Sequence, residues 1–191
     1  MADIHDQCPF APGTIPFYEV RGFGSYENGL ETGKWTYWYG NGKKATQGEY
    51  VEGKKTGYWT SWYGTGEKSG EGWYKEGKQN GWQVVWLRKG QKGGEGEMAD
   101  GKPHGIWVTW GDDGRLGVVT NHSYGHAHGR WIYWGEPEGN VRQGPVVRII
   151  DWENDEPVKA FIFKDGMMVE TEYVEEWWLD SEAASEGQSE G

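Results

Sequence analysis

The chain has 191 residues, of which only 35% are hydrophobic, whereas 33 are glycine and 14 are tryptophan. Hydrophobic residues fall below and glycine lies well above their usual shares in globular proteins, which excludes a thick three-layered core and favours a thin structure of strands and tight turns. The formal net charge of −11 arises at one end, because residues 1–150 hold 17 acidic and 17 basic residues, and residues 151–191 hold 13 acidic and two basic ones. The excess negative charge therefore lies in the C-terminal segment, and the body of the chain is neutral overall.

Residues 1–17 are predicted to form an irregular leader, because they contain Pro9, Pro12 and Pro16 and show no periodic pattern. They lack the basic region and the long apolar run of a signal peptide. No stretch approaches the ~18 apolar residues of a membrane-spanning helix. The single cysteine, Cys8, cannot form an intramolecular disulfide. We therefore expect a soluble, cytoplasmic protein.

Residues 18–145 form a tandem repeat with a period of 24 residues. One glycine column consists of Gly33, Gly57, Gly81, Gly105 and Gly129, and a second column, four residues earlier, consists of Gly29, Gly53, Gly77, Gly101 and Gly125. An unbroken tryptophan column consists of Trp38, Trp62, Trp86, Trp110 and Trp134, and another consists of Trp35, Trp59, Trp107 and Trp131, with Gln83 as its one departure. A fixed period of this kind is the signature of a repeat architecture.

Each repeat is predicted to be one β-hairpin. Its two runs of about seven residues are rich in Trp, Tyr, Thr and Val, which favour strands. Turn residues separate the runs, as in Gly40–Gly42, Gly64–Gly66 and Asp112–Gly114. We therefore expect an all-β fold, a single-layer twisted antiparallel β-meander of five hairpins, in which each repeat advances the sheet by ~10 Å.

Strand alternation places the two tryptophan columns on opposite faces, because they lie three residues apart. One reading is that both ladders of rings are structural and replace a missing core. A single sheet cannot cover both of its faces, however, so at least one ladder is expected to be exposed for binding. We predict binding on the face that carries more hydroxyl groups. Its candidate residues are Trp35, Tyr37, Trp59, Tyr63, Trp107, Trp131 and Tyr133.

The repeating unit G-x-W-x-x-W-x-x-x-G resembles the MORN repeat, and most closely the MORN-variant repeat of bacterial proteins that are labelled as antitoxin components. The stretch GKPHGIW at Gly101–Trp107 is the most typical of that pattern, HAHGRW at residues 126–131 repeats it, and the matching units run from about residue 26 to residue 144. The resemblance implies a curved, twisted sheet that serves as an interaction module, without catalytic activity.

The composition changes after residue 145. Residues 146–174 contain the aliphatic runs Val146–Ile150, Val158–Phe163 and Met167–Val174, which we expect to be strands that cap the open sheet. Residues 175–191 form an acidic tail, predicted to be disordered at its end. The candidate binding residues of the tail are Glu175, Glu176, Trp177, Trp178 and Asp180, among which the two adjacent indoles are expected to dock on the protein itself or on a partner.

The sequence does not predict an enzyme, a metal site or a cofactor. His104 and His128 occupy the same column of successive repeats, and equivalent positions lie ~10 Å apart, too far to share an ion. No nucleophile is accompanied by a base and an orienting group. The glycines precede no predicted helix, so no phosphate-binding loop is implied.

Two binding functions and one structural role remain open. The first is protein recognition, as in an antitoxin or immunity-type inhibitor that binds a basic, nucleic-acid-acting partner through aromatic anchors and an acidic end. The second is binding of single-stranded nucleic acid or anionic lipid through the aromatic and lysine residues, with the acidic tail as an autoinhibitor. The third is a passive scaffold or assembly component.

Overall fold

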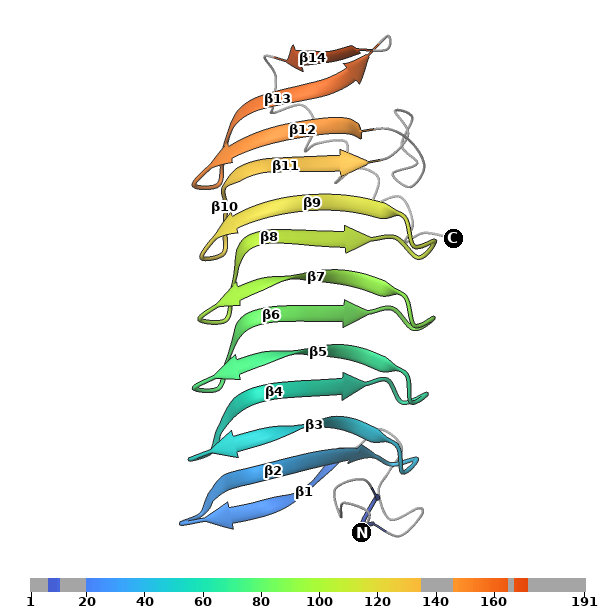
Figure 1. The fold of residues 1–191 in the computed structure, drawn as a ribbon, viewed down its shortest axis with the longest axis vertical. Helices are drawn as coiled ribbons and strands as arrows, with labels where there is room; N and C mark the ends of the chain where they lie inside the picture. Colours follow the sequence, from blue (N-terminus) through green and yellow to red (C-terminus); the bar gives the residue numbers. More distant parts are fainter. Residues whose placement is uncertain (1–6, 11–19, 135–145, 165–166, 172–191) are drawn as a thin grey trace, which may run out of the picture.

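The protein is a single antiparallel sheet in the part of the chain described by its computed structural model, which comprises residues 7–10, 20–134, 146–164 and 167–171. Fourteen strands follow one another in the order of the sequence, with β10 as a short addition beside β9, and no helix occurs among these residues (Figure 1). This confirms the predicted all-β meander.

The strands are β1 (Val20–Glu27), β2 (Leu30–Tyr39), β3 (Lys44–Val51), β4 (Lys54–Trp62), β5 (Lys68–Lys75), β6 (Lys78–Trp86), β7 (Lys92–Ala99), β8 (Lys102–Trp110), β9 (Leu116–Ser123), β10 (His126–Ala127), β11 (Gly129–Trp134), β12 (Val146–Glu153), β13 (Glu156–Lys164) and β14 (Met167–Thr171).

A two-residue turn closes each repeat at one side of the sheet. Between β3 and β4, Glu52 and Gly53 have φ angles of 49° and 75°, the pair of positive values that a tight hairpin turn matched to strand twist requires. The Gly53 amide donates a hydrogen bond of 2.9 Å to the carbonyl of Glu31 in the preceding hairpin. The corresponding bond of Gly77 to Lys55 is also 2.9 Å. Each turn is thus tied to the turn before it.

A bulge follows each of these turns and bends the strand. In β4, Gly57 has a φ of +66°, and the pairing slips so that Gln47 faces Thr60 while Glu49 faces Thr56. Three residues of β4 therefore lie opposite one residue of β3, Gly48, and such an interruption of the ladder bends the bulged strand.

The bulge turns a tryptophan flat onto the neighbouring strand. The indole of Trp59 lies over Gly48, where an added Cβ would overlap with the ring. Its Nε1 donates a hydrogen bond of 3.2 Å to the carbonyl of Glu49. Equivalent bonds, each reaching ten residues back, join Trp35 to Ser25 (3.1 Å), Trp107 to Glu97 (2.7 Å) and Trp131 to Asn121 (2.8 Å).

Gln83, the one departure in this tryptophan column, makes the same bond with a different donor. Its side-chain amide donates to the carbonyl of Trp73 over 2.8 Å, again ten residues back. The side chain is buried and lies over Gly72, the counterpart of Gly48. The position therefore requires a buried donor above a glycine, and an indole is one way to supply it.

We call the side of the sheet with this column the first face, and the side with Trp38, Trp62, Trp86, Trp110 and Trp134 the second face. On the first face Trp59 packs edge-on against Tyr50 and Tyr74, at ring distances of 5.1 and 6.0 Å. On the second face lysine stems lie between the tryptophans. The ammonium of Lys44, for example, lies 5.9 Å from the ring of Trp38 and 5.7 Å from that of Trp62. The rings and stems together replace a second layer.

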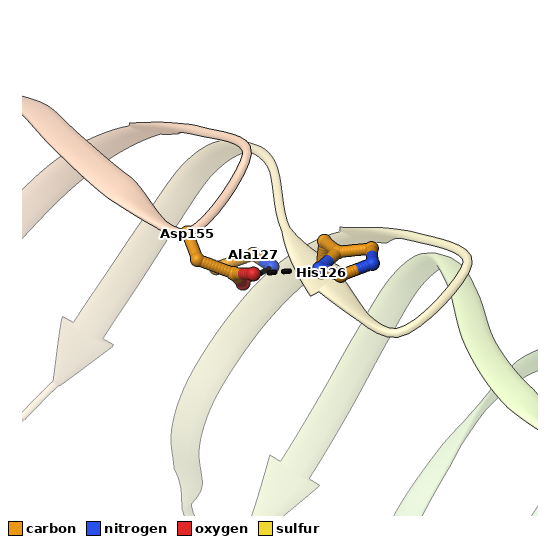
Figure 2. Close-up of polar contacts among 3 residues, drawn as sticks. All are labelled: His126, Ala127 and Asp155. Carbon is orange, nitrogen blue, oxygen red and sulfur yellow. Dashed lines mark hydrogen bonds and ion pairs between the residues drawn. The ribbon is translucent and has the colours of Figure 1, made fainter.

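The strands after the repeats continue the sheet with a modified turn. Asn154 and Asp155 have φ angles of 52° and 68°, and the Asp155 amide donates to the carbonyl of Ala127 over 3.0 Å, as the turn glycines do in the repeats. The Asp155 carboxylate also accepts hydrogen bonds of 2.6 Å each from the Ala127 amide and from His126 Nδ1 (Figure 2). Both bonds help to hold the pKa of Asp155 below its usual value, the bond from His126 contributing most.

A small hydrophobic core accompanies this turn. Ala127, Ile150, Trp152 and Ala160 are buried, and Trp131 and Tyr133 pack against them. The predicted capping segment thus forms β12, β13 and β14 as far as Thr171. Most of the predicted leader and the whole acidic tail lie outside the described residues, and the domain limits stay predictions.

The glycine beneath each ring gives a first test of the fold. We expect Gly48→Ala to lower the free energy of unfolding by roughly 1–3 kcal/mol, because the new methyl group would displace the Trp59 ring. Gly70→Ala is the matched control on the same face of the next hairpin, since an added Cβ there would meet only the Val84 carbonyl oxygen at 3.5 Å. Urea denaturation of both variants measures the difference, and equal stabilities would contradict the packing of the Trp59 ring over Gly48.

A second test concerns His122, which stands where three repeats have tyrosine. Burial lowers its pKa, and the Asp155 charge opposes the shift. The folded state therefore favours the neutral ring, and stability is expected to be lost as the pH falls below the ordinary histidine pKa of ~6.5. We expect His122→Tyr to reduce the loss of melting temperature between pH 7 and pH 5. His128→Asn, at an exposed position where another repeat has Asn80, is expected to leave that loss unchanged. A full loss in the tyrosine variant would overturn the assignment.

Candidate functional site

The structure gathers the predicted aromatic face on the first face of the sheet and covers much of it. Trp35 and Trp59 are only 4% and 2% exposed, and their indole N–H groups are bonded to backbone carbonyls. The other five predicted residues, Tyr37, Tyr63, Trp107, Trp131 and Tyr133, are partly buried. Binding by these residues stays a prediction, and burial favours a structural role for the first two. The predicted tail residues lie outside the described part of the chain.

Two of these tyrosines make internal contacts that join repeats. The Tyr63 hydroxyl donates to the carbonyl of Trp86 over 2.6 Å, and the hydroxyls of Tyr37 and Tyr50 lie 3.2 Å apart. Burial, with a contribution from Tyr37, raises the pKa of Tyr50 far above its ordinary value. The phenol groups on this face therefore serve packing between hairpins.

A different set of aromatic side chains is exposed, and it lies on the second face. Tyr58, Trp73 and Trp82 are 46%, 51% and 49% exposed, and Ile106 is 58% exposed. Tyr58 and Trp73 are directly paired across β4 and β5, with their rings 5.4 Å apart at 68°. Trp73 also packs against Gly81, the residue before Trp82. We call Tyr58, Trp73 and Trp82 the aromatic row, and Ile106 lies beyond it on β8.

The repeats themselves show that the aromatic row is not needed for folding. The column that contains Trp82 consists of Lys34, Tyr58, Trp82, Ile106 and Arg130, and the column that contains Trp73 consists of Ser25, Glu49, Trp73, Glu97 and Asn121. Other repeats therefore form the same hairpin with polar residues at these positions. The prediction from the sequence missed the row because it followed the repeating tryptophans. The signal that could have found the row is an aromatic residue in a repeat column whose residues otherwise vary.

Two carboxylates flank the aromatic row. Glu97 on β7 is paired directly with Trp82, and Glu49 on β3 faces β4 beside Tyr58. Both are exposed, and no ion pair forms at either within the described residues. Two other glutamates on this face do form ion pairs, Glu71 with Lys68 at 2.7 Å and Glu95 with Lys92 at 2.8 Å. The row therefore combines exposed rings with two carboxylates that form no ion pair among the described residues, and Lys34 on β2 is the direct cross-strand neighbour of Glu49.

The surroundings of Tyr58 on the second face shift the pKa of its phenol. Burial raises the pKa of this phenol, and a hydrogen bond to Glu71 contributes in the same direction. The phenol is therefore protonated at neutral pH and remains a hydrogen-bond donor. The rings of the aromatic row can stack on planar or cationic groups, and the carboxylates of Glu49 and Glu97 can accept hydrogen bonds.

Other site types have less support from the described residues. In the ranges that the structure describes, no group of three or more His, Cys, Asp or Glu side chains is placed to hold a metal ion. A cavity at the β8–β9 loop is lined by Trp110, Asp113 and Arg115 among others, and it is partly open to solvent. No described helix has the length and apolar character to cross a membrane.

The fold and the site define a tandem β-hairpin repeat protein with an exposed aromatic row. No protein-family model matches the chain, and no significant match is found among curated proteins. The resemblance to MORN repeats thus stays a prediction.

The contrast between the two kinds of tryptophan can be tested by stability. We expect Trp59→Ala to lower the free energy of unfolding by roughly 3–5 kcal/mol, since it removes a ring that is 2% exposed together with its hydrogen bond. Trp82→Ala removes a ring that is 49% exposed, and we expect a cost of less than about 1.5 kcal/mol. Urea denaturation followed by circular dichroism measures both, and a cost for Trp82→Ala as large as that for Trp59→Ala would contradict a binding role for the row.

Proposed function

We propose that the protein is a non-enzymatic protein-binding module whose contact surface is the aromatic row. The observation that carries the proposal is that Tyr58, Trp73 and Trp82 are about half exposed and adjacent on one face, at positions where other repeats need no aromatic residue. Tryptophan and tyrosine are the residues that most often dominate the energetics of protein interfaces. Contiguous exposed rings on a stable scaffold are typical of such sites.

The charge of the chain favours a basic partner. Residues 151–191 carry 13 acidic and two basic residues, and the exposed Glu49 and Glu97 flank the row. Negative charge of this kind accelerates encounter with a basic protein and disfavours acidic ones. Together with the resemblance to MORN-variant repeats, it supports an antitoxin or immunity-type inhibitor of a basic, nucleic-acid-acting protein. That last step rests on analogy between families.

Binding of single-stranded nucleic acid or anionic lipid is the second candidate. The observation in its favour is the lysines between the tryptophans of the second face, such as Lys44 between Trp38 and Trp62. Lys68 and Lys92 occupy the same repeat column as Lys44, and they are neutralised by Glu71 and Glu95. A polyanion would have to displace these carboxylates, so the contacts favour a protein partner. A passive scaffold is the remaining alternative, and self-association without another partner would support it.

Capture from the native cell extract tests the proposal. The bait proteins are the full chain, the double variant Trp73→Thr/Trp82→Thr, a chain that ends at Thr171, and the control Tyr124→Asn. Threonine keeps strand propensity without a ring. Tyr124 is 56% exposed away from the row, at a turn position where Asn28 and Asn154 stand in other hairpins.

We expect a basic protein to be captured by the full chain and by Tyr124→Asn, and at least about tenfold less of it by the double variant, because one lost anchor residue costs 1–2 kcal/mol or more. Mass spectrometry and staining for nucleic acid identify what is bound. Equal capture by the double variant would overturn the aromatic row as the contact surface. Nucleic acid captured more strongly by the chain that ends at Thr171 would favour the second candidate.

A further inference from the structure

We infer that the aromatic row recognises an extended segment of the partner that bears arginine side chains, with one guanidinium group at each end of the row. This inference rests on the proposed function and deepens it by giving the chemistry of the partner. It is carried by the pairing of exposed rings with exposed carboxylates that have no ion-pair partner within the described residues.

The pairing of Trp82 with Glu97 provides one end of the site. The two residues face each other directly on β6 and β7, which places their Cβ atoms ~5 Å apart on the same face. Both side chains are exposed. A single guanidinium group can therefore stack on the indole and donate two parallel hydrogen bonds to the carboxylate, since its planar fork matches carboxylate geometry. A lysine ammonium is more strongly hydrated and makes only point contacts.

Glu49 provides the other end, beside Tyr58. It lies on β3, which precedes the strand of Tyr58, and its backbone pairs with Thr56. Two other carboxylates on the same face are already paired, Glu71 with Lys68 at 2.7 Å and Glu95 with Lys92 at 2.8 Å. The charge that is left for a partner is thus concentrated at the two ends of the rings.

The first face contains an internal example of the same chemistry. The ammonium of Lys55 lies 4.2 Å from the ring of Trp59 and 5.3 Å from that of Tyr74. The sheet thus already positions one of its own cations over an indole of a repeat. On the second face no described lysine covers Trp73 or Trp82, which leaves their rings to a cation from outside.

The strand spacing predicts the spacing of the arginines. Glu49 on β3 and Glu97 on β7 are separated by four strand intervals, or ~19 Å at ~4.8 Å per interval. An extended segment that crosses the strands advances ~3.3 Å per residue. Its two arginines are therefore expected about six residues apart, with apolar residues between them over Tyr58 and Trp73.

Synthetic peptides test this inference with the full chain. The first peptide has two arginines six residues apart, separated by serine and one central leucine. The others replace both arginines with lysine or with glutamate, or place the arginines three residues apart, and a fifteen-residue oligothymidine serves as the polyanion probe. Calorimetric titration at two salt concentrations gives the affinities. We expect the first peptide to bind about tenfold more tightly than the lysine peptide, and no binding of the glutamate peptide or the oligothymidine.

Charge-neutralising variants assign the contact. Glu97→Gln and Glu49→Gln are each expected to weaken binding of the first peptide about five- to tenfold, because each removes a charge-assisted pair. Glu76→Gln is the matched control, with the same change of charge at an exposed turn residue outside the row, and is expected to leave the affinity unchanged. Circular dichroism of each variant checks that the substitution preserves the fold.

The inference would be overturned by equal affinity for arginine and lysine peptides, by tighter binding of the oligothymidine, or by Glu97→Gln and Glu76→Gln weakening the peptide equally. If extract capture still depends on Trp73 and Trp82 in that case, the proposed function stands and only the chemistry of the partner is wrong. If neither peptide binding nor capture depends on the row, both proposals fail.

Discussion

The hydrogen bond from a buried side-chain donor to a backbone carbonyl ten residues earlier, made above a glycine, is the interaction on which the array depends. A bulge interrupts the strand ladder at this point and leaves a carbonyl that requires a partner. The indole of Trp59 supplies the donor and covers the exposed backbone in the same step. Gln83 shows that the donor is the constant element, because an amide without an aromatic ring fulfils the role.

This interaction explains how a single sheet is stable without a second layer. Rings that lie flat over glycine bury themselves against the backbone, as the 2% exposure of Trp59 shows, and they pack edge-on against the tyrosines of the neighbouring strands. The bulk of the stabilising packing is thereby concentrated in repeated positions. Columns outside this network, such as that of Trp82, tolerate charged, aliphatic or aromatic residues. In repeat proteins such positions are where surfaces for recognition can vary at little cost to folding.

The turn and the packing of the sheet change beyond the last repeat. The hairpin of β12 and β13 keeps the hydrogen bond between turns but has Asp155 where the repeats have glycine, and its carboxylate makes two additional bonds to the preceding turn. Lys159 replaces the glycine of the bend, and Ile150 and Ala160 pack there with Trp152. The β12–β13 pair keeps a register shift, now between Asp151 and Trp152, so the bulge persists in a smaller form beyond the repeats.

The sequence by itself determined the period, the hairpin as the unit and the antiparallel order, because glycine columns and strand-forming runs act locally. It also assigned the two tryptophan columns to opposite faces, since alternation is a property of any strand. Only the tertiary structure decided which rings are covered, because the flat position of Trp59 depends on a register slip between two strands and on the glycine of the neighbouring strand. For the same reason the exposed row of Tyr58, Trp73 and Trp82 became visible only once the strands were paired, as burial is set by contacts across the sheet and not by spacing along the chain.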